Sequence, residues 1–492
     1  MTGVESRSED SEPSHLPAVR SLRPGSPPDR RKVRPPLRLW LALLFALPAC
    51  SYSIVRHGQI NETAATRIER GLETLRGLKF VTPVPMEVKS PEELRGYLVQ
   101  ELERQYSPAQ VHGLQRVYER LGLLPPTVDL GEALLKLYTS QIAGFYDPRV
   151  GTLFLVPSGV PAQGWMMSFL QFMLHRDLVN EMLLAHELTH ALQDQHFGVL
   201  AMADDPEDDD RSLAIHAVVE GDATLAGFAY VLGGLPEGSL MELVERLDAV
   251  PAELEAALPD TPAVLRESLV FEYSAGARFV AQAYLRAGWP GVNALLAHPP
   301  TSTEQILWPE RYFARPDSPT EVRLGGLDDY RTSDEWTVVE ENTLGALTVR
   351  ILAERFLDPS RAEQIARGWD GDRLLAFDRA GILHLYWMTI WDSEGDARRF
   401  FMAESEILAA RHASSPRKSE SERVTAGGEE PYWLERHGDK VLVALGVPTH
   451  EAAKRVENVW AKTTFAPMQI HLDLDLAASD ARRIDLQGRV LN

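Results

Sequence analysis

The chain has 492 residues, 44% hydrophobic and 25% charged, which is enough apolar material for a globular protein of two or three domains. Its 71 acidic and 50 basic residues give a formal net charge of −21, which argues against a nucleic-acid partner because a phosphate backbone attracts a basic surface. The single cysteine, Cys50, excludes an internal disulfide and a cysteine-based zinc site.

The N-terminal segment carries a targeting pattern. Basic residues at 30–34 precede a short apolar stretch, Leu39–Leu47, and the small residue Ala49 stands before Cys50. The apolar stretch is too short to span a bilayer. This order resembles a bacterial lipoprotein signal over residues 1–49, which implies cleavage before Cys50, a lipid on its sulfur and attachment to a membrane of the cell envelope, on the outer-membrane or periplasmic side. The alternative is an ordinary secretory signal and a freely secreted protein.

The first predicted domain covers residues 76–325 and follows a tether over residues 50–75. Helices are predicted where serine precedes proline at positions 90 and 107, because serine caps a helix and proline suits its first turn. A further helix is expected over 131–141. Residues 144–156 predict a hairpin of two short strands, the second of them at 152–156.

Residues 180–197 predict an amphipathic helix that carries an HExxH motif, His186-Glu187-Leu188-Thr189-His190. One helical turn separates His186 and His190, so both imidazoles reach one metal ion from the same face. Two histidines in an otherwise apolar element need a partner, and one zinc ion per chain would satisfy both. Glu187 then stands beside the ion, where it acts as the general base toward a zinc-activated water.

Catalytic zinc needs a third protein ligand, and two residues compete for that place. Glu220 lies in a second apolar helical run, Ile215–Thr224, where an unpaired glutamate is costly to bury. His196 would complete the pattern HExxHxxGxxH, but Gln193 stands where that pattern has the glycine that ends the helix. If the helix continues, His196 lies roughly 9 Å beyond His190 along the axis and misses the metal. The sequence therefore favours Glu220.

Four strings together resemble the bacterial gluzincin metallopeptidases, in particular a group of secreted or membrane-anchored proteins. They are HELTHALQDQHF at 186–197, VVEGDAT at 218–224, GFYDP at 144–148 and PTSTEQ at 300–305. The resemblance implies zinc held by His186, His190 and Glu220, with Glu187 as the base. It also implies an edge strand ahead of the motif helix, expected at 152–156, that holds an extended peptide by main-chain pairing.

Four further residues are candidates for supporting roles in the site. Asp222 and Asp194 are acidic residues close to the ligands in sequence, where a carboxylate can orient a metal-bound histidine. Tyr273 and Tyr312 are candidates for stabilising the oxyanion that forms during hydrolysis.

From about residue 330 the pattern changes to short strands that alternate with helices. This change predicts a smaller α+β domain over residues 330–464, followed by a tail at 465–492. The expected fold class is α+β: a mainly helical, gluzincin-like catalytic domain with a small β-sheet, and then the smaller domain.

The predicted function is that of a membrane-anchored zinc metalloendopeptidase that acts on protein or peptide substrates in the cell envelope. Two alternatives stay open. A non-catalytic envelope or binding protein would keep the fold and lose turnover, although the intact Glu187 argues against it. A metal-dependent hydrolase of another amide or ester would use the same residues.

Overall fold

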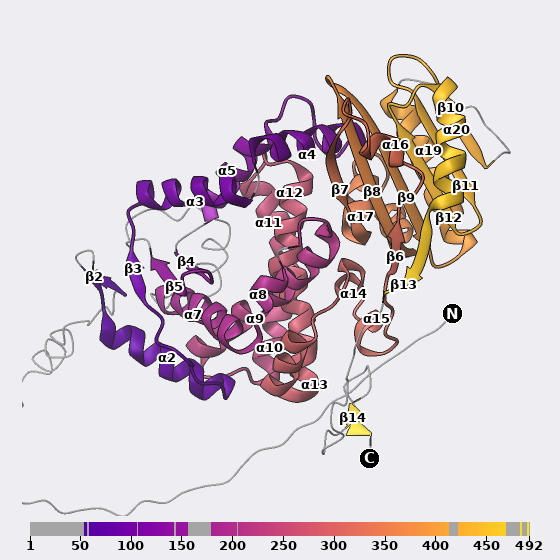
Figure 1. Cartoon of the computed structure of the whole chain (residues 1–492). Helices are drawn as coiled ribbons and strands as arrows, with labels where there is room; N and C mark the ends of the chain where they lie inside the picture. The colour runs from indigo at the N-terminus through magenta and orange to yellow at the C-terminus, as the bar shows by residue number, and fades with distance from the viewer. Residues whose placement is uncertain are drawn as a thin grey trace, which may run out of the picture. The chain divides into compact units, whose positions relative to one another are not determined.

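The computed structural model describes residues 54–56, 59–105, 107–141, 144–155, 179–203, 205–412 and 422–468, together with two short strands, β14 (Arg483–Ile484) and β15 (Val490–Leu491). The predicted signal at 1–49 and the predicted lipid site Cys50 lie outside these residues. The fold is α+β, as predicted: helices predominate up to about residue 315, and a six-stranded sheet follows (Figure 1).

The N-terminal helices are α2 (Glu62–Arg76), α3 (Pro91–Gln105), α4 (Pro108–Leu121) and α5 (Leu130–Gln141). The last three begin within one residue of the predicted positions. By contrast, α2 occupies most of the stretch predicted as a tether and packs into the core through Ile68 and Leu72. The Ser107 side chain accepts from the backbone of Gln110, whose own side chain accepts from the Ser107 N–H, so both orphan donors at the start of α4 are satisfied. Ser90 and Glu93 make the same reciprocal pair at the start of α3.

A small sheet lies beside these helices, in the strand order β3-β5-β4. Its strands are β3 (Met86–Val88), β4 (Gly144–Asp147) and β5 (Thr152–Leu155), and a two-stranded piece, β1 (Val55–Arg56) with β2 (Gln59–Ile60), precedes them. β5 runs parallel to β3 and antiparallel to β4. The predicted hairpin is therefore present, but the expectation that its second strand lies at an edge is wrong: β5 is the central strand, because β3 pairs with its other side, and β3 and β4 are the edges.

Three long helical elements form the centre of the helical part. They are α7 (Val179–Phe197), α9 (Asp209–Leu232) and the consecutive elements α12 (Ala263–Val270), η1 (Phe271–Ala275) and α13 (Gly276–Ala297), the last of which is kinked at Ala287 and Gly288. Among the described helices, α9 is long and apolar enough to cross a membrane, but 72% of its apolar window is buried inside the protein, as expected for a core helix. The shorter helices around them are α8 (Val199–Met202), α10 (Glu237–Leu247), α11 (Val250–Ala257), α14 (Thr303–Leu307) and α15 (Glu310–Phe313).

Glycines let α9 and η1–α13 approach closely. A Cβ on Gly276 would lie 2.0 Å from the carbonyl oxygen of Ala217, and a Cβ on Gly221 would lie 2.4 Å from the Gly276 backbone. Only glycine fits at both positions, so the residues next to Gly221 and Gly276 are brought together.

The C-terminal part is built on an antiparallel sheet in the order β10-β11-β12-β9-β8-β7. Its strands are β7 (Thr337–Asn342), β8 (Trp369–Arg379), β9 (Ile382–Trp391), β10 (Arg423–Ala426), β11 (Tyr432–His437) and β12 (Lys440–Leu445). The helices of this part are α16 (Asp328–Arg331), α17 (Gly345–Glu354), α18 (Pro359–Ala366), α19 (Glu394–Arg411) and α20 (Thr449–Lys462). β13 (Thr464–Pro467), at the start of the predicted tail, pairs with β6 (Thr320–Arg323).

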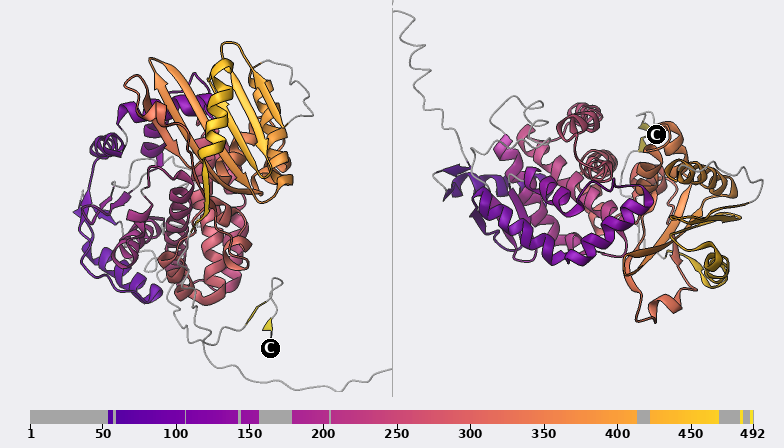
Figure 2. Two further views of the ribbon diagram at one scale, coloured as in Figure 1. Left: turned by 45° about the vertical axis from the view of Figure 1, so that its right-hand side comes forward. Right: turned by 90° about the horizontal axis from the view of Figure 1, so that it is seen from above.

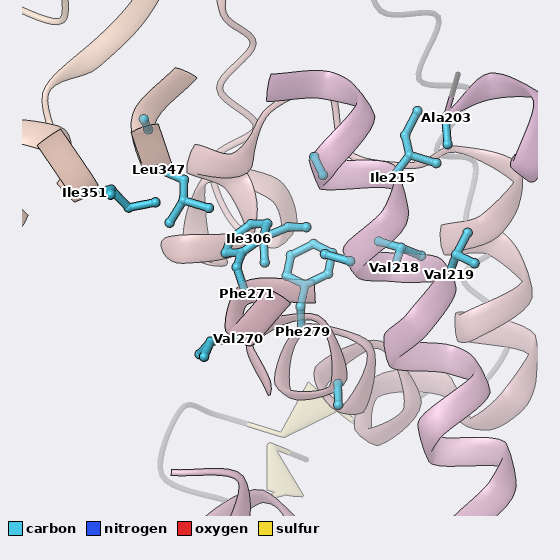
Figure 3. Close-up of a cluster of buried hydrophobic side chains, with 14 of the residues drawn as sticks. Ala203, Ile215, Val218, Val219, Val270, Phe271, Phe279, Ile306, Leu347 and Ile351 are labelled. Carbon is cyan, nitrogen blue, oxygen red and sulfur yellow. The ribbon is translucent and has the colours of Figure 1, made fainter. Parts of the chain in front are cut away.

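Both faces of the six-stranded sheet are covered (Figure 2). Along β8, Leu374 points into the core shared with α17 and α19, whereas Leu375 and Phe377 point into the core shared with α16 and α20. This alternation is the two-residue period of a strand. The larger core continues from Ile215 and Phe279 in the helical part to Leu347 of α17, so the two predicted domains share one core (Figure 3).

Candidate metal centre

His186 and His190 of α7 converge with Glu220 of α9. The Nε2 atoms of the two histidines are 3.1 Å apart, and the Glu220 carboxylate lies 3.2 Å from His186 Nε2 and 3.6 Å from His190 Nε2. The three ligand atoms all lie within 4.8 Å of one another. Glu220 Oε2 is buried without a hydrogen-bond partner, and a bound cation would satisfy it. The buried group therefore fits a metal ion and could hold one.

The charge states of Glu220 and His190 suit a cation, whereas His186 has to lose a proton first, because Glu220 outweighs burial and raises the pKa of His186. Burial raises the pKa of Glu220, but the neighbouring His190 and His186 outweigh burial and hold that pKa at about 2, so the carboxylate is ionised. Burial lowers the pKa of His190, which favours the neutral imidazole. An ionised carboxylate and a neutral imidazole are the forms that coordinate metals.

The apolar packing of α7 against α9 fixes the distance between the ligands. The described residues from Met182 to Leu192 of α7 are all buried. Gly227 of α9 lies directly against α7, because a Cβ there would be 3.1 Å from the Met182 carbonyl oxygen. Glu220 lies two turns before Gly227 on α9, so this close contact brings its carboxylate to the histidines.

Gln193 orients His190. Its side-chain nitrogen donates to the Val219 carbonyl oxygen at 2.9 Å and to Asp222 Oδ2 at 2.8 Å. Both amide N–H groups thus donate to other acceptors, so the amide oxygen, 2.9 Å from His190 Nδ1, must accept a hydrogen bond from the Nδ1–H group. The tautomer with the proton on Nδ1 leaves the Nε2 lone pair free for a metal.

Arg76 of α2 holds Asp222, the carboxylate that Gln193 contacts, in place. Its guanidinium forms a fully buried ion pair with Asp222 at 2.7 Å and donates to Asn293 Oδ1 at 2.9 Å. It also lies over the Trp289 ring, 4.6 Å from the ring centroid. Asp222 therefore supports His190 through Gln193 rather than by direct contact.

Glu187 lies beside the ligands and is held by the edge strand. Its Oε2 accepts from the backbone N–H of Tyr146 in β4 at 3.1 Å, and the side chain is buried. Burial raises the pKa of Glu187 to about 8. This gives a carboxylate with the proton affinity of a general base near neutral pH.

Tyr273, in the π-helical turn η1, contacts the candidate ligands His186 and Glu220. Its ring is stacked on His186 with centroids 6.4 Å apart, and its hydroxyl hydrogen-bonds to Glu220. Burial raises the pKa of Tyr273 well above its ordinary value, so the hydroxyl keeps its proton. π-helical turns often mark functional sites, and here the turn points Tyr273 at a ligand.

The remaining candidates lie elsewhere. Asp194 accepts a hydrogen bond from the Tyr146 hydroxyl at 2.8 Å and so links α7 to β4. The Tyr312 hydroxyl donates to the His298 carbonyl oxygen at 2.5 Å, and none of its described contacts reaches the ligands. His196 is exposed and its Nε2 donates to the Lys79 carbonyl oxygen at 2.7 Å, which places it outside the ligand group.

Comparisons with known proteins cover only part of the chain. Residues 333–457, from β7 into α20, match a family described as a domain of unknown function, DUF8575, and the three candidate ligands lie outside this match. No curated protein matches the chain. A solved structure from Chloroflexus aurantiacus, described as "a putative hydrolase with a novel fold", is 18% identical and covers 53% of this chain and 91% of that chain, with a TM-score of 0.34. This likeness is too low to assign a function.

Proposed function

We propose that the protein is a zinc-dependent metallopeptidase of the gluzincin type. The observation that carries the proposal is the group of His186, His190 and Glu220 with Glu187 next to it, held by a strand edge. Two imidazoles and one carboxylate are a donor set typical of catalytic zinc. When bound, zinc would supply a Lewis acid that activates water and polarises the scissile carbonyl.

The chain's own groups supply the proton transfer. The buried Glu187 carboxylate takes the proton of the attacking water and returns it to the leaving amine, because its raised pKa makes both steps possible near neutral pH. The Tyr146 N–H holds that carboxylate in place. The Tyr273 hydroxyl, which keeps its proton, donates a hydrogen bond at the metal centre.

The edge of β4 supports a peptide as the substrate. Leu153, the partner of Tyr146, donates its N–H to Pro85 on the β3 side, so the main-chain groups of Tyr146 face away from β5 and toward Glu187. By the two-residue alternation of a strand, the groups of Gly144 face the same way. Among the described strands β4 pairs with β5 alone. Because Glu187 already accepts from the Tyr146 N–H, the main-chain groups of Gly144 are the ones that would pair with an extended peptide.

The test is Glu187→Gln, with zinc content measured by elemental analysis and hydrolysis measured on unfolded protein and a peptide library. The variant should keep about one zinc per chain, because Glu187 is not a ligand, and should lose roughly two to four orders of magnitude in rate. Equal rates would assign the cleavage to a contaminant. Full zinc loading without cleavage by the wild type would instead favour a hydrolase of another amide or ester, or a non-catalytic protein.

The membrane location is proposed from the sequence pattern that ends at Cys50. Cells grown with a labelled lipid precursor should tag the wild type and not Cys50→Ser. An untagged wild type would favour a freely secreted protein.

A further inference from the structure

A cluster of three aromatic rings lies beside the edge strand β4. Phe145 of β4, Phe154 of β5 and Tyr97 of α3 contact one another pairwise, with ring centroids between 5.0 and 5.3 Å apart. Phe145 and Phe154 are direct partners in the register of the two strands, so their side chains share one face of the sheet. Phe154 is buried, whereas Phe145 and Tyr97 are partly exposed. The cluster therefore leaves part of two aromatic rings accessible.

Polar contacts hold Tyr97 in this cluster. Its hydroxyl donates to the buried carboxylate of Asp147, at the end of β4. The Arg149 guanidinium donates to the Tyr97 hydroxyl at 3.1 Å and pairs with Asp147 at 2.8 Å. The ring of Tyr97 is thus already fixed, which lowers the entropy cost of packing a further side chain against it.

Strand geometry places the ring of Phe145 next to a peptide that pairs with β4. The main-chain groups of Phe145 point to β5, because those of its neighbours Gly144 and Tyr146 point to the other edge. In an antiparallel pair, the Cα atoms of two residues that face each other at such a position are only about 4.5 Å apart. A substrate residue opposite Phe145 therefore puts its side chain against that ring, on the same face of the sheet. The Tyr146 side chain lies on the other face, where its hydroxyl bonds to Asp194 of α7.

We propose that Phe145 is a specificity-determining residue that selects a large apolar or aromatic side chain of the substrate. The inference rests on the proposed peptidase function and names its substrate class: peptides with such a side chain close to the scissile bond. The position is close to that bond because both neighbours of Phe145 lie at the general base. The Tyr146 N–H donates to Glu187, and a Cβ on Gly144 would lie 3.8 Å from Glu187 Cγ. An aromatic side chain gains a ring contact there, whereas a charged one loses hydration without a partner.

The experiment cleaves a mixed-sequence peptide library with the zinc-loaded full chain and reads the residue preference at each position around the cut by mass spectrometry. Phe145→Thr removes the ring and keeps a residue that suits a strand. Phe145→Arg puts a cation in its place. The matched control is Phe356→Thr, which removes an exposed ring outside the small sheet, just after α17. Thermal unfolding checks that each variant is folded.

The wild type should favour large apolar residues over small polar ones at one position by up to roughly tenfold in kcat/KM. Phe145→Thr should lose the preference at that position alone. Phe145→Arg should replace it by a preference for aspartate and glutamate, a switch that misfolding cannot produce. Phe356→Thr should keep the wild-type profile.

Two results would overturn the assignment and leave the peptidase proposal standing. One is cleavage by the wild type without an apolar preference at any position. The other is a residue profile that is the same in the wild type and in both Phe145 variants. No cleavage of the library by the zinc-loaded wild type would overturn both proposals.

Discussion

Replacing Gln193 with leucine should weaken metal binding although it removes no ligand. The substitution takes away the acceptor for His190 Nδ1 and the donor to Asp222 and the Val219 carbonyl oxygen. Loss of a residue that hydrogen-bonds to a metal-binding histidine typically costs about 10- to 100-fold in metal affinity. That range corresponds to roughly 1.4 to 2.7 kcal/mol.

The stability cost can be estimated separately. Gln193 is fully buried and makes three hydrogen bonds, each worth about 0.5 to 1.5 kcal/mol net. Asp222 keeps its ion pair with Arg76, so its charge is not left alone. The metal-free variant should therefore unfold about 2 to 4 kcal/mol more easily and still be folded at 25 °C.

Zinc affinity would be measured by competition with a chromophoric chelator, and the fold by thermal unfolding of the metal-free proteins. Gln195→Leu is the matched control, because this residue lies on the same helix and, among the described residues, its amide hydrogen-bonds to residues 81 and 82. A folded Gln193→Leu variant with the affinity of the wild type would refute the argument that Gln193 orients His190.

Three further outcomes are expected. Elemental analysis should show that Glu220→Ala loses the metal and that His196→Ala keeps it; the reverse ranking would make His196 the third ligand. Denaturant unfolding should show that Gly276→Ala lowers the free energy of unfolding by several kcal/mol, because the added methyl group overpacks a tight contact. Gly238→Ala, with open space around it, should be neutral or slightly stabilising. Equal effects would contradict the close contact between the helices. Glu404 is buried, and burial raises its pKa to about 8. The folded state therefore keeps a proton that the unfolded state releases, so the free energy of unfolding should fall between about pH 4.5 and pH 8 by up to roughly 1.4 kcal/mol per pH unit. Glu404→Gln should flatten the dependence of the melting temperature on pH in this window, and an unchanged slope would show that other groups cause it.

The convergence of the candidate ligands could be anticipated from the sequence because its causes are local. The spacing of His186 and His190 places them one turn apart on any helix. The burial cost of Glu220 in an apolar helix follows from its immediate neighbours. The helix boundaries followed likewise from capping residues such as Ser107.

The supports of the site could not be anticipated, because their partners are distant in sequence. Gln193 stood out only as a departure from a glycine pattern, and its bond to Asp222 spans 29 residues. The bond from Arg76 to Asp222 spans 146 residues and nothing local marks it. The position of β5 at the centre of its sheet depends on β3, a three-residue strand whose pattern is too short to predict.

The wide sequence span of these supports has a consequence for the newly made chain. Synthesis as far as the end of α9 provides all three ligands, but Tyr273 and Asn293 are still missing. Arg76 is made early, but its hydrogen-bond partner Asn293 is made 217 residues later. The candidate metal centre can therefore gain all of these supporting contacts only after the chain has grown past α13, and a shorter nascent chain lacks them.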